Sequence, residues 1–177
     1  LKNSQTAYGA VSKLLHWLSA VIIIGLFVLG FWMVGLDYYS QWYKTAPDWH
    51  RSVGILLCLA TLLRLWWKLK NTTPSALVNH SVSTVKLAKI THFLLYLLLF
   101  IIFISGYLIS TADGQNIAVF TWFDIPAFGE FFNNQADIAG AIHEYMAYIL
   151  ITLALLHSVA AIKHHVKDKD ATLSRIL

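Results

Sequence analysis

The segment from Ile138 to Ile162 reads IAGAIHEYMAYILITLALLHSVAAI and contains two histidines, His143 and His157, within one apolar stretch. Fourteen residues separate the two histidines. On an α-helix this spacing gives ~21 Å of rise and a net rotation of about 40°. Both imidazoles therefore face nearly the same way from one helix, at opposite depths of an apolar layer.

Two histidines at different depths indicate two stacked cofactor sites. Neutral imidazole is a common metal ligand and an axial ligand of haem iron. Each iron would need a second axial ligand from another helix. A single histidine in such a span is more often a packing residue or part of a proton relay, and a haem-free proton pathway is therefore the alternative interpretation.

The composition places the chain in a membrane. Of its 177 residues, 58% are hydrophobic and 12% are charged, and its mean hydropathy is +0.61. Soluble domains are usually about a quarter charged. Four segments reach the ~20 residues needed to cross the hydrocarbon core, at about 12–36, 48–68, 87–110 and 138–163. The sequence predicts an all-α bundle of four transmembrane helices that forms one domain over residues 1–177.

The basic residues predict the orientation of this bundle. If the spans alternate, all Lys and Arg residues except Lys44 and Arg51 lie on one side of the membrane. Loops rich in Lys and Arg usually stay in the cytoplasm, so both termini are expected to be cytoplasmic. The net charge of +4 is explained by this topology and needs no nucleic-acid partner.

The other spans supply histidines at matching depths. His50 opens the second span and shares the periplasmic depth with His143. His16 and His92 share the cytoplasmic depth with His157. The outer half thus has two ligands for one bis-histidine haem, and the inner half has three candidates for two positions.

Space for a porphyrin distinguishes these candidates, because residues at i+4 lie on the ligand's own helix face. A small residue follows four of the histidines at this spacing: Ala20 after His16, Gly54 after His50, Ala147 after His143 and Ala161 after His157. Tyr96 follows His92 instead. This pattern favours the first four histidines as ligands and leaves His92 as the spare one.

Other metal chemistries fit the sequence less well. Zinc prefers four ligands gathered at one point, which the outer depth would supply only if Glu144 and Asp48 or Asp137 joined His50 and His143. A di-iron carboxylate bundle would need a pair of Glu-x-x-His helices, and the sequence has none.

Arg64 lies fourteen residues after His50, on nearly the same helix face and at the cytoplasmic depth. Two interpretations are open. The guanidinium snorkels to the interface, or it faces the bundle as a partner for the propionates of an inner haem.

The segments outside the spans carry weaker signals. The loop 69–86 shows no site, and His80 within it is expected to be solvated. The aromatic segment 111–137 either rests at the headgroup level or forms a lid over the outer cofactor. The tail from Lys163 onward is expected to be a solvated extension of the fourth helix. Ser105-Gly106 suggests a kink or a close contact.

Several motifs together resemble the bacterial cytochrome b561 family over nearly the whole chain. They are Leu15-His16-Trp17, His50-x-x-x-Gly54, Arg64, His92, Ile142-His143-Glu144, His157 and Lys163-His164-His165. The resemblance implies a four-helix protein of the bacterial inner membrane with two b haems. It implies that His16 pairs with His157 on the cytoplasmic-side haem and that His50 pairs with His143 on the periplasmic-side haem.

The same resemblance implies electron transfer between a periplasmic donor and membrane quinone. Ubiquinone would be the acceptor, at a site near the inner haem bordered by Arg64 and His164. One member of the family oxidises superoxide and reduces ubiquinone, so a superoxide:ubiquinone oxidoreductase activity is expected as one possibility. The alternative is a haem-bearing membrane anchor that relays electrons for a periplasmic oxidoreductase or a lipid-binding partner.

Overall fold

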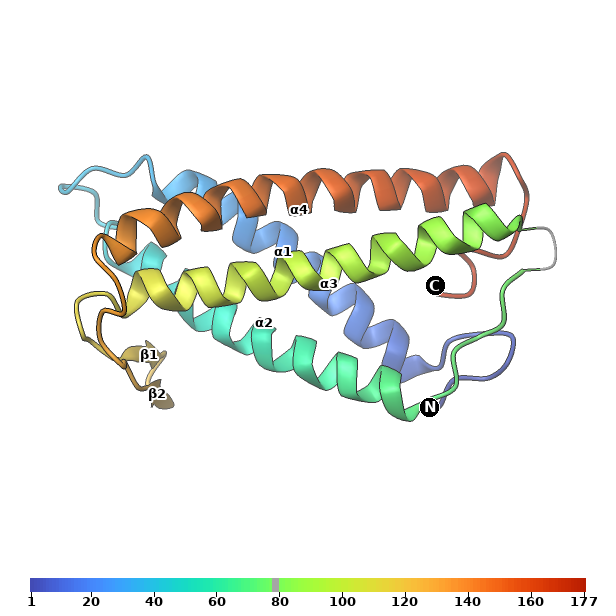
Figure 1. The fold of residues 1–177 in the computed structure, drawn as a ribbon, viewed down its shortest axis with the longest axis horizontal. Helices are drawn as coiled ribbons and strands as arrows, with labels where there is room; N and C mark the ends of the chain where they lie inside the picture. Colours follow the sequence, from blue (N-terminus) through green and yellow to red (C-terminus); the bar gives the residue numbers. More distant parts are fainter. Residues whose placement is uncertain (78–79) are drawn as a thin grey trace.

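The computed structural model describes residues 1–77 and 80–177, and four long helices dominate this part of the chain (Figure 1). In order they are α1 (Ala10–Met33), α2 (Thr45–Lys70), α3 (Val82–Ser110) and α4 (Gln135–Val166). Each is long and apolar enough to cross a membrane. The predicted all-α bundle with four candidate spans is confirmed.

Helices α2, α3 and α4 extend beyond the predicted spans, whereas α1 ends at Met33, before the predicted end at about residue 36. α3 begins at Val82 because the Ser81 side chain caps it, accepting a hydrogen bond of 3.1 Å from the Thr84 amide. α4 begins at Gln135, whose fully buried side chain donates to Leu108 O at 2.9 Å and accepts from the Phe131 amide at 2.8 Å. Hydropathy locates the apolar centre of a helix but cannot detect such polar first turns.

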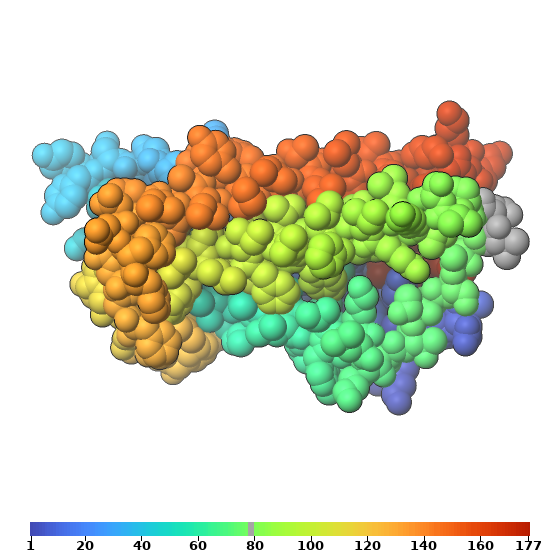
Figure 2. Space-filling view, viewed as in Figure 1, coloured from blue at the N-terminus to red at the C-terminus, as the bar shows by residue number. Residues whose placement is uncertain are grey.

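The four helices pack as two pairs, α1 with α2 and α3 with α4, and contacts between the pairs are sparse. Figure 2 shows α3 and α4 lying against each other along one face of the molecule. The main buried apolar cluster joins Leu98 and Leu99 of α3 to Leu150 of α4. Most other large apolar side chains are exposed, as expected where lipid rather than water surrounds the helices.

A small antiparallel hairpin, β1 (Ile117–Val119) and β2 (Phe123–Ile125), lies between α3 and α4. It docks on the start of α2, where the Ser52 hydroxyl accepts from the Phe120 amide at 2.9 Å and donates to Ala118 O at 3.3 Å. Val119 is completely buried there. Strands of three residues leave no readable alternation in the sequence. We call this end of the bundle the hairpin end.

Both chain termini lie at the opposite end, which we call the termini end (Figure 1). α4 stops at Val166 and the tail folds back across the bundle, so the prediction of a solvated helical extension was wrong. The tail is held by hydrogen bonds from Trp17 Nε1 to Ile176 O (2.9 Å) and from the Arg175 guanidinium to Ser75 O (2.7 Å). These partners are distant in sequence, and for that reason the local pattern did not reveal them.

Candidate functional site

His50 on α2 and His143 on α4 face each other at the hairpin end. Their ring centroids are 6.2 Å apart and the ring planes are inclined by 66°. A metal–imidazole bond is about 2 Å long and the ring adds about 1 Å on each side, so two rings that share one ion lie roughly 6 Å apart. The two predicted outer ligands therefore already have the spacing of a bis-histidine site.

His143 is oriented by α3. Its Nδ1 lies 3.0 Å from the carbonyl oxygen of Ile102 and 3.2 Å from the hydroxyl of Ser105, which itself donates to the same carbonyl. Since a carbonyl only accepts, Nδ1 of the neutral ring carries the proton. The lone pair is then on Nε2, which is the state of a histidine ready to bind a metal.

His50 is held differently. Its Nδ1 is buried and forms no hydrogen bond within residues 1–77 and 80–177. Gly30 of α1 lies against this edge of the ring, at Cε1 and Nδ1, so Nε2 is the nitrogen left to bind a metal.

Two glycines make room for the outer histidines. Gly30 of α1 lies against His50, and Gly106 of α3 lies against His143. A Cβ atom at either position would come within 3.1 Å of the ring carbon Cε1. The close contact predicted for Ser105-Gly106 is therefore a contact with His143. No local pattern identified the partner of either glycine, because each histidine lies on a different helix from its glycine.

The termini end contains the three inner histidines. The rings of His92 on α3 and His157 on α4 are in edge-to-face contact, with centroids 5.2 Å apart. His16 on α1 is instead within 2.8 Å of the Arg64 guanidinium, measured to its Nδ1. The structure thus places His157 against His92, and it shows no ring contact between His157 and His16 among the described residues.

Arg64 points into the bundle and does not snorkel. Besides His16, its guanidinium approaches the ring of Tyr96, 5.6 Å from the centroid, and Lys68 approaches the same ring at 5.3 Å. A guanidinium can only donate, so Nδ1 of His16 accepts and the proton of the neutral ring is on Nε2. For Nε2 of His16 to bind iron, this contact with Arg64 has to open.

His164, at the end of α4, lies in a different polar group. Its Nδ1 is 2.7 Å from Asp168 Oδ2, and its ring is 5.0 Å from that of His80. The side chain of His80 is only 16% exposed, and its Nε2 is 2.8 Å from Asp170 Oδ2. The expectation that His80 is solvated was wrong, because the folded tail brings Asp170 to it.

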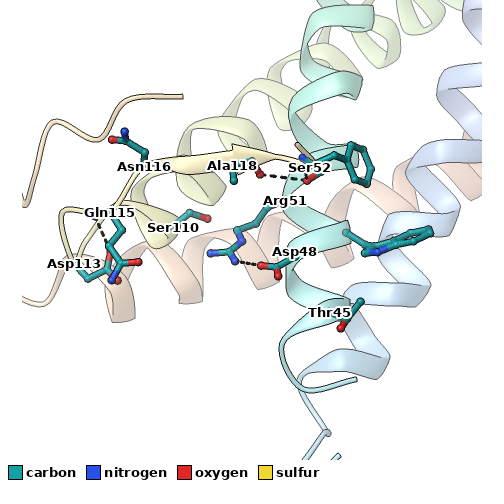
Figure 3. A pocket seen from close by; sticks show the side chains of 11 residues that line it. Thr45, Asp48, Arg51, Ser52, Ser110, Asp113, Gln115, Asn116 and Ala118 are labelled. Atoms are coloured by element: carbon teal, nitrogen blue, oxygen red, sulfur yellow. Dashed lines mark hydrogen bonds and ion pairs between the residues drawn. The ribbon is translucent and has the colours of Figure 1, made fainter. Parts of the chain in front are cut away.

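A polar pocket of about 400 Å³ opens at the hairpin end, between the start of α2, the end of α3 and β1 (Figure 3). Arg51 lies in its wall and is paired with Asp48. Asp113 lines the same pocket from the loop after α3. The pocket therefore has more carboxylates than cations, although it contains an arginine. It adjoins the turn of α2 that carries His50.

The chain matches a known family along almost its whole length. The family model described as prokaryotic cytochrome b561 covers residues 7–177. The chain belongs to this family. Its members bind b-type haem and transfer electrons across a membrane, so this cytochrome is a multi-pass membrane protein of electron transport. The predicted family resemblance is confirmed.

Among its relatives, this cytochrome is 49% identical to cytochrome b561 homolog 2 of Escherichia coli (strain K12) over 175 residues, which cover 99% of the chain and 93% of the relative. It is 28% identical to the probable superoxide oxidase CybB of Yersinia pestis over 174 residues, or 96% and 95% of the two chains. It is 25% identical to cytochrome b561 homolog 1 of Escherichia coli (strain K12) over 167 residues, 92% of each.

Proposed function

We propose that this cytochrome, acting as one unit, passes electrons from a donor at the hairpin end to membrane quinone at the termini end through two b haems. The facing pair His50 and His143 is the observation that carries this proposal, together with a second group of histidines around His157, fourteen residues further along α4. Haem iron supplies one-electron oxidation and reduction. The protein holds the two sites at opposite depths on α4.

The helix arrangement supports the ligand pairs. His50 belongs to the α1–α2 pair and His143 to the α3–α4 pair. A haem bound by both would therefore connect two helix pairs that otherwise make few contacts. His16 with His157 would bridge the pairs in the same way. His92 and His157 both belong to α3–α4, whose helices pack closely and leave less room for a porphyrin. We therefore assign His16 and His157 to the inner haem.

Arg64 can then interact either with His16 or with a haem propionate. In the structure its guanidinium donates to His16. Once His16 turns its Nε2 to a metal, the guanidinium is free to neutralise a propionate, as one of the two sequence-based interpretations expects. The same side chain, with Tyr96 and Lys68, forms a cationic and aromatic wall that we propose borders the quinone. The prediction that His164 borders the quinone is open to the same test.

Charge supports the orientation of the electron path. The termini end carries nearly all Lys and Arg residues, so we place it in the cytoplasm and the cytochrome in the bacterial inner membrane. The donor is then periplasmic, and quinone reduced at the termini end takes its protons from the cytoplasmic side.

Two kinds of donor fit the hairpin end. Superoxide is suggested by the relative named a probable superoxide oxidase. The pocket beside His50 favours a different donor, because Asp48 neutralises Arg51 and Asp113 adds a negative charge, which does not attract an anion. This observation supports the second function, in which the cytochrome relays electrons from a periplasmic oxidoreductase or lipid-binding protein.

Anaerobic rapid mixing would test both functions. The haem content of the purified cytochrome is measured first. The oxidised protein is then mixed with superoxide, and the reduced protein with a soluble ubiquinone analogue. Haem absorption is followed in both reactions. Superoxide oxidation requires haem reduction that added superoxide dismutase abolishes. Quinone oxidation of the reduced haem without any response to superoxide, together with co-purification of a stoichiometric periplasmic partner, would favour the relay. Failure of quinone to oxidise the haem would contradict both.

A further inference from the structure

A second polar pocket, of about 210 Å³, lies at the termini end and, apart from His164, contains no residue of the electron path proposed above. Three segments that are distant in sequence meet there. They are the loop before α3 with His80, the end of α4 with Lys163 and His164, and the folded tail with Asp168 and Asp170.

The pocket gathers metal-ligating atoms at one point. One ligand atom from each of His80, His164 and Asp170 lies within 4.8 Å of the others. Asp170 Oδ2 is 2.8 Å from His80 Nε2 and 3.6 Å from His164 Nδ1. Zinc bonds to nitrogen and oxygen are about 2.0–2.2 Å long, which sets tetrahedral ligand atoms roughly 3.5 Å apart. Small side-chain shifts would therefore centre an ion among these three groups.

His164 Nδ1 is chemically unsatisfied in the absence of such an ion. Although it lies 2.7 Å from Asp168 Oδ2, the contact lacks hydrogen-bond geometry, and this buried nitrogen has no hydrogen-bond partner among the described residues. His164 Nδ1 also lies 3.6 Å from Asp170 Oδ2, a separation close to that of two ligands of one tetrahedral ion.

Asp170 is the most buried member of this cluster, with a side chain only 8% exposed. Its carboxylate accepts hydrogen bonds from the Thr172 amide at 2.8 Å and from His80 Nε2 at 2.8 Å. A carboxylate buried beside two imidazoles is either paired with them or shares a metal ion with them.

We propose that His80, His164 and Asp170 bind a divalent cation of the zinc class. Two imidazoles and one carboxylate form a donor set typical of zinc. The fourth position is open to water or to Asp168, whose carboxylate now pairs with Lys163 at 2.6 Å. Lys163 therefore competes with the metal ion for Asp168. Asp168 can join the site only by breaking its ion pair with Lys163.

Such an ion would fasten the tail to the membrane helices. The tail otherwise reaches the bundle through hydrogen bonds such as that of Trp17 Nε1 to Ile176 O. An ion bound by His80, His164 and Asp170 would add a tie between the loop before α3, α4 and the tail. The fold of the termini end would then depend on the availability of zinc.

Calorimetric titration of zinc into the haem-loaded cytochrome tests this site. The protein carries no affinity tag and is first treated with chelator; bound haem keeps the membrane histidines occupied. We expect saturable binding of one zinc per chain, weakened at least about tenfold in His80→Ala and in Asp170→Asn. His165→Ala is the matched control, since this exposed histidine neighbours His164 but lies outside the pocket, and its zinc affinity should equal that of the wild type.

A second measurement guards against variants that fold poorly. Each variant must show the wild-type haem spectrum, and zinc should slow proteolysis of the tail in the wild type and in His165→Ala but not in His80→Ala. If the wild type binds no zinc, or if His80→Ala binds it equally well, the cluster is only an ion-pair network and the proposal is wrong. Neither result depends on electron transfer, so this inference and the proposed function can fail separately.

Discussion

The surroundings of the two outer histidines show how single residues position the proposed haem ligands. His143 is fixed by hydrogen bonding of Nδ1 to Ile102 O, whereas His50 is placed by steric fit beside Gly30. The hydrogen bond fixes both the tautomer and the ring direction of His143, whereas the steric contact fixes only the position of His50. The two proposed ligands of the outer haem therefore depend on their surroundings in different ways.

Replacing Gly30 or Gly106 by alanine should disturb the outer haem and spare the inner one. The new Cβ would lie 3.1 Å from the ring carbon of His50 or His143, so the ring must move by a few tenths of an ångström. We expect a shifted potential or partial loss of one of the two haems, measured by redox titration and by haem content. Gly25→Ala on α1 is the matched control, because nothing lies within 4 Å of a Cβ at that position. An equal effect of all three substitutions would contradict this steric role.

The inner ligands can be separated by comparing His16→Ala with His92→Ala. If His16 and His157 hold the inner haem, His16→Ala should lower the haem-to-protein ratio from about two to about one, and His92→Ala should leave it near two. His50→Ala provides the reference spectrum for loss of the outer haem alone. The reverse result would assign the inner haem to His92 and His157, whose rings are in contact in the structure.

At the scale of elements, the hairpin and the tail close the two ends of the bundle through polar contacts. Ser52 on α2 makes two hydrogen bonds with the hairpin, and Gln135 on α4 bonds the end of α3 and the loop before α4. Both side chains are buried. Hydrogen bonds of this kind, together with the burial of Ile117 and Val119, fix how the hairpin sits on the helices.

Substituting Ser52 by alanine should loosen the hairpin selectively. It leaves the Phe120 amide without its hydrogen-bond partner, at a cost of about 1–3 kcal/mol for a buried unsatisfied group. We expect faster hydrogen exchange at the amides of residues 117–125 and a lower thermal unfolding temperature. Ser158→Ala, which removes only an exposed bond within α4, should change neither. Unchanged exchange in Ser52→Ala would show that apolar contacts alone hold the hairpin.

At the scale of the whole molecule, the two helix pairs make few contacts with each other, and each proposed haem would lie between them. α4 contributes a histidine to each end, and the proposed partner of each lies on the other pair. Four spans bring both termini to one end, where the positive charge is concentrated. The two proposed ligand sites and the charge asymmetry therefore both follow the long axis of the bundle.

The charge asymmetry predicts which end faces the cytoplasm. A C-terminal fusion to green fluorescent protein should fluoresce, whereas the same fusion to alkaline phosphatase should be inactive, because the phosphatase needs the periplasm. A fusion of each reporter into the loop 37–44, between α1 and α2, should give the opposite result. Active phosphatase at the C-terminus would invert the proposed direction of electron flow.

The sequence by itself determined the membrane class, the four helices and the histidines at two depths, because hydropathy and the helical period are local properties of the chain. Only the tertiary structure showed that Gly30 and Gly106 lie against outer histidines, that Arg64 contacts His16, and that His80 meets His164 and Asp170. Each of these contacts joins residues on different helices or in the folded tail. Such partners are set by how the helices pack and where the tail folds back, and no periodicity in the sequence encodes that arrangement.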